Sequence, residues 1–436
     1  MSEPVVVTGR GVVSPLGTTR ARHLERLYAG EHAFEPQSEW IERRLPIEIA
    51  ARVEGFDTRA RIRNRMLRKL LQPSAAFAVG AAAEALDDAK IASAGQGAAG
   101  QGKAELERCG LYVGSVSFEL SPDFFAPALR TSFRAGRAHR DAFDMQRFAD
   151  QGMAVLDPLL IVKGLPNAAL SGVAIELGVK GPTVNLANGT VSGAQAIAAA
   201  HDAIVDGEIE IALAGGSDSL LEPHHVVEHW VRSGLSRSGQ CRPFDGERDG
   251  YLPGQGAGFV VLESLTHARR RGATILGSVG HIGESTAVPT GDDPASATTD
   301  ALRHALEATV DSLSAEPMQE EAIQAIFAQG AATRDDDARE ARVCGERLAE
   351  TPITATTGAH GYLGAASGPF QVIHALEALQ RNELPPTVGC PFPDPTLGID
   401  VTTRTRAGSF ENLLILTSDA GRKNVAMIVS SAVERA

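Results

Sequence analysis

The chain has 436 residues, enough for one large domain or two fused ones. Hydrophobic residues make up 43% and charged residues 22%, which is ordinary for globular proteins and excludes a disordered chain. A net charge of −13 argues against nucleic acid as a partner, because phosphate binding depends on lysine and arginine. No stretch supplies the roughly 18 consecutive apolar residues that a membrane-spanning helix needs, so no membrane association is predicted.

The cysteine spacing and the N-terminal residues predict the cellular compartment of the protein. Cys109, Cys241, Cys344 and Cys390 lie far apart and lack the paired spacing of a zinc site or a disulfide framework. The first residues, MSEPVVVTGRGVV, contain no basic segment followed by a long apolar one, so no signal peptide is predicted. Both features favour the cytoplasm, and no metal or other cofactor is expected.

Short apolar runs rich in β-branched residues alternate with alanine-rich segments of helical period, which predicts a mixed α/β fold. In the first half, strands are expected at residues 5–7, 111–113, 183–186, 211–214 and 258–262, with a glycine-rich surface loop at 95–103. After Glu263 the alternation begins again, with strands expected at 275–279, 325–328, 353–356, 413–416 and 425–429 and helices near 297–313 and 368–381. This rhythm indicates two α/β units, residues 1–263 and 264–436.

One segment is strongly basic although the chain as a whole is negatively charged. It contains Arg59, Arg61, Arg63, Arg65, Arg68 and Lys69. Such a patch can hold an acidic partner, and a solvated helix face explains it equally well.

Residues 181–219 carry the strongest functional signal. A β-branched strand leads into a turn of small residues at 188–190, followed by a helix over about 192–205 and a second strand that ends in two glycines. Thr190 is therefore expected at a strand-to-helix elbow, where helical amides serve a nucleophile and a developing oxyanion together.

The order of residues in this segment resembles the active-site segment of β-ketoacyl synthases, in which a Gly-Pro-Ser strand leads to a Thr-Ala-Cys elbow, a helix and an Ala-Gly-Gly strand end. VVVTGRGVVSPLG (5–17) resembles the family's opening strand, and RPFDGERDGYLPGQGAGFVVLE (242–263) resembles its internal signature. With Asn167 and residues 363–366, the resemblance extends over nearly the whole chain. It implies a thiolase-type fold, with two related α/β halves stacked in five layers. It also implies dimerisation through the strand Thr183, Val184, Asn185 and Leu186.

The resemblance places Thr190 where the family has its catalytic cysteine. A cysteine at a helix N-terminus readily becomes a thiolate, whereas a threonine hydroxyl is a poor nucleophile without a neighbouring base. Gln329 takes the position of the first family histidine, and Asp337 and Glu340 keep the family's acidic pair. An amide can donate a hydrogen bond to a thioester carbonyl, but it cannot shuttle a proton.

The second histidine position lies in GAHGYLGAASG, residues 358–368, which resembles the family's Gly-His-Leu-Leu-Gly-Ala-Ala pattern. Alignment on 364–366 puts Gly361 at that position, and a local bulge would bring His360 there instead. The lysine usual upstream is absent from 354–357. In the oxyanion and gating loop, 417–424, Gly421 and Asn424 persist, while Ala420 replaces the phenylalanine gate.

These losses together predict a chain that does not condense acyl groups by itself. The first hypothesis is a partner subunit that resembles the chain-length factors of type II polyketide, aryl-polyene or fatty-acid-like systems. It would pair with an intact ketosynthase and receive an acyl carrier protein at Arg65, Arg68 and Lys69. The second is an active acyltransferase with Thr190 as acceptor and His360 as base. The third is a homodimeric decarboxylase or carrier-binding scaffold that needs only oxyanion amides and a cavity.

Overall fold

The computed structural model describes residues 3–92, 101–116, 119, 121–133, 143–288, 294–314 and 323–431. Ten strands form its central sheet: β1 (Val5–Val13), β4 (Gly110–Gly114), β5 (Thr183–Leu186), β6 (Ile211–Ser219), β7 (Gln255–Ser264), β8 (Gly277–Thr286), β9 (Ala325–Phe327), β10 (Ile353–Thr354), β13 (Asn412–Asp419) and β14 (Lys423–Ser430). They lie in the order β10-β9-β13-β14-β8-β1-β7-β6-β4-β5. Two small ribbons pair β2 (Phe34–Pro36) with β3 (Ile49–Ala51) and β11 (Glu383–Leu384) with β12 (Arg406–Ala407).

The two halves of this sheet have the same strand order. From the centre outwards, β1, β7, β6, β4 and β5 are the first, fifth, fourth, second and third of the N-terminal five. The strands β8, β14, β13, β9 and β10 repeat this order in the C-terminal five. In both halves the inner two pairings are antiparallel and the outer two are parallel. The repetition confirms two related α/β halves, while their boundary after residue 263 stays a prediction.

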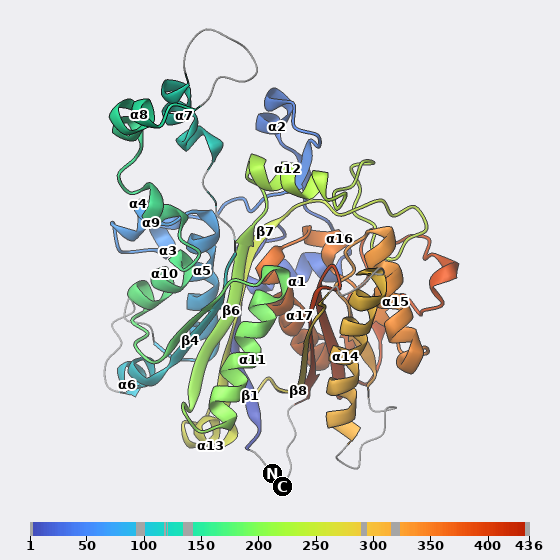
Figure 1. Cartoon of the computed structure of the whole chain (residues 1–436). Coiled ribbons are helices and arrows are strands. Elements are labelled where there is room, and N and C mark those ends of the chain that lie inside the picture. Colours follow the sequence, from blue (N-terminus) through green and yellow to red (C-terminus); the bar gives the residue numbers. More distant parts are fainter. Residues whose placement is uncertain are drawn as a thin grey trace.

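Helices cover both outer faces of the sheet and fill the space between its halves (Figure 1). The outer layers are α5 (Pro73–Asp88) with α10 (Ala168–Leu177), and α14 (Pro294–Ser314) with α15 (Arg334–Leu348). The central layer is α11 (Ser192–Val205) with α17 (Ser367–Arg381), whose apolar side chains share one core with both halves. Because β1 also pairs with β8, the two halves of the sheet are continuous, and the three helix layers pack against them.

The remaining helices are short. They are α1 (Arg20–Tyr28), α2 (Ser38–Arg43), α3 (Thr58–Arg61), α4 (Leu67–Leu70), α6 (Gln101–Arg108), α7 (Ala126–Ser132), α8 (Met145–Arg147), α9 (Leu160–Gly164), α12 (Pro223–Val231), α13 (Leu265–Arg270) and α16 (Thr357–His360). Figure 1 shows α7 and α8 set apart from the sheet. No helix among the described residues is both long and apolar enough to cross a membrane.

All ten predicted strands and the predicted helices are present, with shifted ends. The strand predicted at 353–356 stops at Thr354, because the chain turns there into α16. Of the loop predicted at 95–103, residues 95–100 lie outside the described residues. The prediction is wrong for 101–103, which begin α6, because the helix-favouring sequence Ala-Glu-Leu-Glu-Arg that follows propagates the helix backwards.

The two central helices approach each other at their N-termini, and glycine makes this contact possible. A Cβ on Gly193 in α11 would overlap the carbonyl oxygen of Ala365, just before α17. A Cβ on Gly368 in α17 would lie 2.6 Å from the Cβ of Ala194. The spacing of α11 and α17 therefore depends on these two glycines.

We expect Gly193→Ala to lower the free energy of unfolding by about 1–3 kcal/mol, since the added methyl forces the central helices apart. The matched control is Gly345→Ala in α15, where a Cβ meets nothing within 4 Å. There the same change should stabilise the chain by about 0.5–1 kcal/mol. Denaturant unfolding of both variants measures the difference, and equal midpoints would contradict the packing argument.

Candidate functional site

The predicted elbow is present between β5 and α11. Strand β5 leads into a short 3₁₀ turn, η5 (Gly189–Val191), and Gly189 adopts a φ of +80°, which favours glycine. The Ser192 hydroxyl accepts a hydrogen bond from the N–H of Asn188 (2.8 Å) and donates one to the carbonyl of Gly189 (2.6 Å). These bonds close the turn and hold Thr190 at the start of α11, where it is only 5% exposed.

The Thr190 hydroxyl is paired with the phenol of Tyr362. Thr190 Oγ1 lies 2.9 Å from the Tyr362 hydroxyl oxygen, and Tyr362 is 6% exposed. Burial raises the pKa of Tyr362 well above its ordinary value, so the phenol stays protonated. Sequence reasoning missed Tyr362. The available signal was a tyrosine at a place where the family pattern has leucine.

Gly361 carries the aligned position of the second histidine, and its surroundings leave little room for a side chain. Its φ is +79°, and a Cβ there would lie 3.0 Å from the carbonyl oxygen of Leu252 and 3.1 Å from Gly254 Cα. His360 turns into the protein interior instead, where its ring packs edge-on against Phe370 with the ring centroids 5.3 Å apart. The geometry thus brings Tyr362 to Thr190 and leads His360 into a separate cluster.

That cluster is a chain of three buried histidines. The hydrogen-bonded atoms run from His360 Nδ1 to the Gly361 carbonyl (2.9 Å), from His360 Nε2 to Thr356 Oγ1 (3.1 Å) and from Thr356 Oγ1 to His374 Nδ1 (3.3 Å). It continues from His374 Nε2 to His23 Nε2 (2.7 Å) and from His23 Nδ1 to Ser14 Oγ (2.7 Å). Because a carbonyl only accepts, His360 must carry its proton on Nδ1, and each later donor is then fixed in turn.

All three histidines of this cluster are neutral near pH 7. Burial is the largest cause in each case, and it lowers the pKa of His360 from 6.5 to about 4. It lowers the pKa values of His23 and His374 well below 6.5, with the neighbouring rings as further causes. His360 is therefore a neutral hydrogen-bonding residue whose two ring nitrogens are both engaged.

Gln329 follows β9, and the acidic pair fixes its backbone. Glu340 accepts hydrogen bonds from the N–H groups of Gln329 (2.8 Å) and Gly330 (2.9 Å), while Asp337 accepts one from Ala332 (3.0 Å). Burial raises the pKa of Glu340 to about 7. The amide oxygen of Gln329 is buried without a hydrogen-bond partner among the described residues. The acidic pair therefore orders this segment, and the Gln329 side chain supplies no proton carrier.

The predicted Gly421 lies in the turn between β13 and β14, and the predicted Asn424 lies at the start of β14. The Ser418 hydroxyl accepts from the Gly421 N–H (2.9 Å) and donates to the Asn424 side chain (2.8 Å), and Asn424 Nδ2 donates to the Gly421 carbonyl (3.0 Å). These bonds make a rigid turn. Asp419, which sequence reasoning missed, places its carboxylate where a Cβ on Gly189 would be. Burial raises the pKa of Asp419, and the charge of Lys423 opposes that effect.

The basic segment is anchored beside α4 with its charges exposed. The Glu176 carboxylate accepts from the backbone N–H groups of Arg63 (2.6 Å) and Asn64 (3.1 Å). Arg65 and Lys69 are exposed, and Arg68 is half-buried. Within the described parts of the chain, none of these last three forms an ion pair.

Strand β5 is at the edge of the sheet, so one side of its backbone pairs with no other strand among the described residues. Its inner side bonds to β4, through Leu111 N–H to the Pro182 carbonyl (2.8 Å) and Ser115 N–H to the Leu186 carbonyl (3.0 Å). The alternation of a strand then turns the backbone groups of Thr183 and Asn185 outwards. The Asn185 side-chain oxygen is buried, with no hydrogen-bond partner in the described structure.

Exposed apolar side chains are concentrated in the described residues of two neighbouring segments, 122–133 and 143–165. Of the eighteen large apolar side chains exposed in the described structure, eleven belong to them, and we call this set the apolar face. Its members are Phe124, Leu129, Phe133, Phe143, Met145, Met153, Val155, Leu159, Ile161, Val162 and Leu165. Exposed apolar side chains so concentrated are typical of a protein interface.

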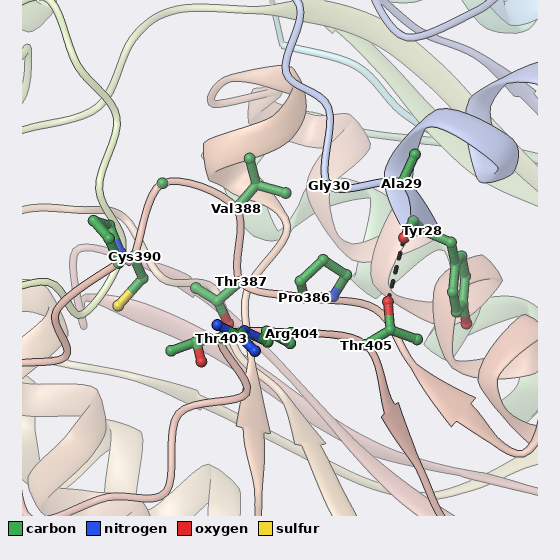
Figure 2. Close-up of a pocket in the computed structure, with 12 residues that line it drawn as sticks. Tyr28, Ala29, Gly30, Pro386, Thr387, Val388, Cys390, Thr403, Arg404 and Thr405 are labelled. Carbon is green, nitrogen blue, oxygen red and sulfur yellow. Dashed lines mark hydrogen bonds between the residues drawn. The ribbon is translucent and has the colours of Figure 1, made fainter.

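A pocket of about 420 Å³ lies apart from the elbow, between α1 and the loops at 386–391 and 403–405 (Figure 2). The Thr405 hydroxyl donates to the Tyr28 carbonyl (3.2 Å) at its edge. Among the lining residues Arg404 alone is charged at neutral pH, and burial raises the pKa of the Cys390 thiol to about 12. The pocket therefore offers no activated nucleophile and no base.

Known families and curated relatives match the chain. Residues 2–268 match the family described as beta-ketoacyl synthase, N-terminal domain, and residues 281–391 match beta-ketoacyl synthase, C-terminal domain. Nodulation protein E of Rhizobium leguminosarum bv. trifolii is 34% identical over 264 residues, covering 57% of this chain and 63% of that protein. The match thus spans less than two thirds of that relative. The 3-oxoacyl-[acyl-carrier-protein] synthase 2 of Staphylococcus aureus (strain COL) is 24% identical over 412 residues, covering 91% and 90%.

Solved structures match the fold over nearly the whole chain. The ishigamide ketosynthase/chain length factor has a TM-score of 0.83 at 24% identity, covering 99% of this chain and 100% of that one. A beta-ketoacyl synthase from Burkholderia phymatum STM815 has a TM-score of 0.81 at 26% identity, with the same coverage. A type II PKS acyl-carrier protein in complex with its ketosynthase, AntDE:AntF, gives 0.80 at 21%, again covering 99% and 100%. The predicted five-layer, thiolase-type fold is confirmed.

The histidine chain predicts how stability depends on pH. The pKa of His360 is about 4 in the folded chain against an ordinary 6.5, so the unfolded chain binds the extra proton first. The contribution of His360 is complete above pH 6.5 and is lost as the pH falls toward 4, at roughly 1.4 kcal/mol per unit. The stability difference between the parent and His360→Gln should therefore shrink by about 2 kcal/mol between pH 6.5 and 5.

Urea unfolding at several pH values measures this difference, and His304→Gln on the exposed face of α14 is the control. The difference between parent and variant cancels the titration of buried groups that do not interact with His360. If the difference in free energy of unfolding between the parent and His360→Gln stays constant or increases as the pH falls, His360 is not neutral in the folded chain.

Proposed function

We propose that this chain, which belongs to the beta-ketoacyl synthase family, is a non-catalytic partner subunit of the chain-length-factor type. It pairs with an intact ketosynthase of a type II polyketide, aryl-polyene or fatty-acid-like system and shapes the cavity for the acyl chain. The observation that carries the proposal is the Thr190–Tyr362 hydroxyl pair at the elbow. Condensation in this family needs a thiolate there and two imidazoles beside it, and this elbow offers neither.

Acyl transfer by Thr190 is the competing proposal, and the local chemistry argues against it. A threonine hydroxyl needs a base within hydrogen-bond reach. Its partner is the Tyr362 phenol, whose pKa burial raises, so the phenol cannot take the proton. His360 is the other base considered, and both of its ring nitrogens are engaged elsewhere.

Two regions of the protein favour the proposed binding of a partner subunit. The free edge of β5 presents the backbone groups of Thr183 and Asn185 for pairing with another strand. The side-chain oxygen of Asn185, which has no hydrogen-bond partner among the described residues, belongs to the same strand. The apolar face supplies a second region that loses contact with water when covered. An interface that uses both combines backbone hydrogen bonds with apolar burial, as stable dimers do.

The basic segment supports docking of an acidic acyl carrier protein. Arg65, Arg68 and Lys69 form no ion pairs within the described structure, and the Glu176 anchor holds their loop in place. Cations left free of internal partners steer an acidic protein and then pair with it. The carrier protein seen with its ketosynthase in the AntDE:AntF structure is consistent with such an encounter.

Co-expression with an intact ketosynthase from the same gene neighbourhood tests the pairing. We expect the two chains to co-purify through a tag on this one, and Asn185→Pro to reduce recovery of the ketosynthase by roughly tenfold or more, because proline removes an outward N–H. Asn185→Ala, which keeps that N–H, is the matched control. A stable, active homodimer that needs no ketosynthase would overturn the proposal.

Charge reversal tests the docking segment. Arg65→Glu combined with Arg68→Glu should weaken binding of the holo acyl carrier protein to the purified pair by roughly tenfold, with the loss largest at low salt. Arg269→Glu combined with Arg270→Glu, both exposed in α13, is the control of equal charge change. Fluorescence anisotropy of labelled carrier protein measures both. Unchanged affinity in the double variant would remove this segment from the docking site.

A further inference from the structure

We infer that Tyr362 is a plug that closes the elbow of this chain to acyl groups, so that a cysteine restored at position 190 would remain inaccessible. The inference goes beyond the proposed partnership, because it concerns this chain alone and holds with or without a partner. It assigns Tyr362 a role in excluding acyl groups from the elbow of this chain.

The plug lies directly on the position of the nucleophile. The Tyr362 hydroxyl is 2.9 Å from Thr190 Oγ1, and both side chains are buried. An acyl thioester must bring its carbonyl carbon close to the atom at position 190, at about 3–3.5 Å. The phenol already occupies hydrogen-bonding distance on that side, so the thioester and the phenol compete for the same space.

The backbone of Tyr362 is fixed on both sides. Its N–H donates to the Leu252 carbonyl (2.9 Å), and its own carbonyl accepts from the Gly254 N–H (3.0 Å). The preceding Gly361 adopts a φ of +79° against the same segment. These contacts set the direction in which the Tyr362 side chain leaves the backbone.

The ring is fixed as well. It stacks on Tyr251 with the ring centroids 4.3 Å apart and the planes 20° from parallel. Tyr251 is itself held by a hydrogen bond between its hydroxyl and His229 Nδ1 (2.5 Å), and Gly234 packs against its phenol end. Rotating Tyr362 out of the elbow breaks the stack and the Thr190 bond together.

Asp419, the last residue of β13, lies beside the elbow. Its carboxylate lies against Gly189, in the turn that carries Thr190. Asp419 also acts electrostatically on Tyr362 and Tyr251, whose pKa values it helps to raise. A negative charge here disfavours a thiolate at position 190 and repels an acyl group that bears a carboxylate.

Alkylation of a restored thiol tests the plug. The variants are Thr190→Cys alone, Thr190→Cys with Tyr362→Leu, and Thr190→Cys with Tyr362→Phe. Iodoacetamide is the probe, and mass spectrometry of the peptide that contains position 190 gives the rate. We expect the leucine double variant to react roughly tenfold faster or more than Thr190→Cys alone, and the phenylalanine variant to stay slow because its ring still fills the space.

Internal controls keep the result interpretable. Cys109 and Cys344 are buried in separate cores, so their alkylation reports unfolding of either half. Thr190→Cys with Tyr251→Leu removes the stack and should also speed the reaction, which provides a second route if Tyr362→Leu does not fold. Equal rates for Thr190→Cys alone and for the folded leucine double variants would overturn the inference and leave the proposed partnership untouched.

Discussion

The hydrogen bond from His360 Nδ1 to the Gly361 carbonyl is the constraint on which the site depends. A carbonyl accepts only, so this bond sets the tautomer of His360 and, through Thr356, those of His374 and His23. These hydrogen bonds link α1, α16 and α17. His360 lies in this buried cluster, whereas Tyr362, two positions later, faces Thr190.

Buried hydrogen-bond acceptors also fix the backbone around Gln329. Glu340 and Asp337 accept backbone N–H groups at 329–332 and leave the Gln329 side chain outside that network. In both places, groups that resemble catalytic machinery serve as structural acceptors or donors. A buried polar group without a partner is costly, and these hydrogen bonds give the carboxylates and the histidines their partners.

Sequence alone predicted the elements better than the site. The elbow around Thr190 follows from local signals, a β-branched strand, small turn residues and an alanine-rich helix, and its boundaries agree with η5 and α11. Tyr362 meets Thr190 across 172 positions, and no periodicity contains that contact. Asp419 and the histidine chain were missed for the same reason, since each depends on how the two halves of the fold meet.

The free edge of β5 also affects how such a chain exists before it meets another. Backbone groups turned outwards and an orphan amide oxygen at Asn185 are satisfied by water or by any strand that arrives first. In the proposed pair, the amount of complex formed follows by mass action from the ratio in which the two chains are synthesised. An excess of this chain would leave β5 edges that can pair with other strands.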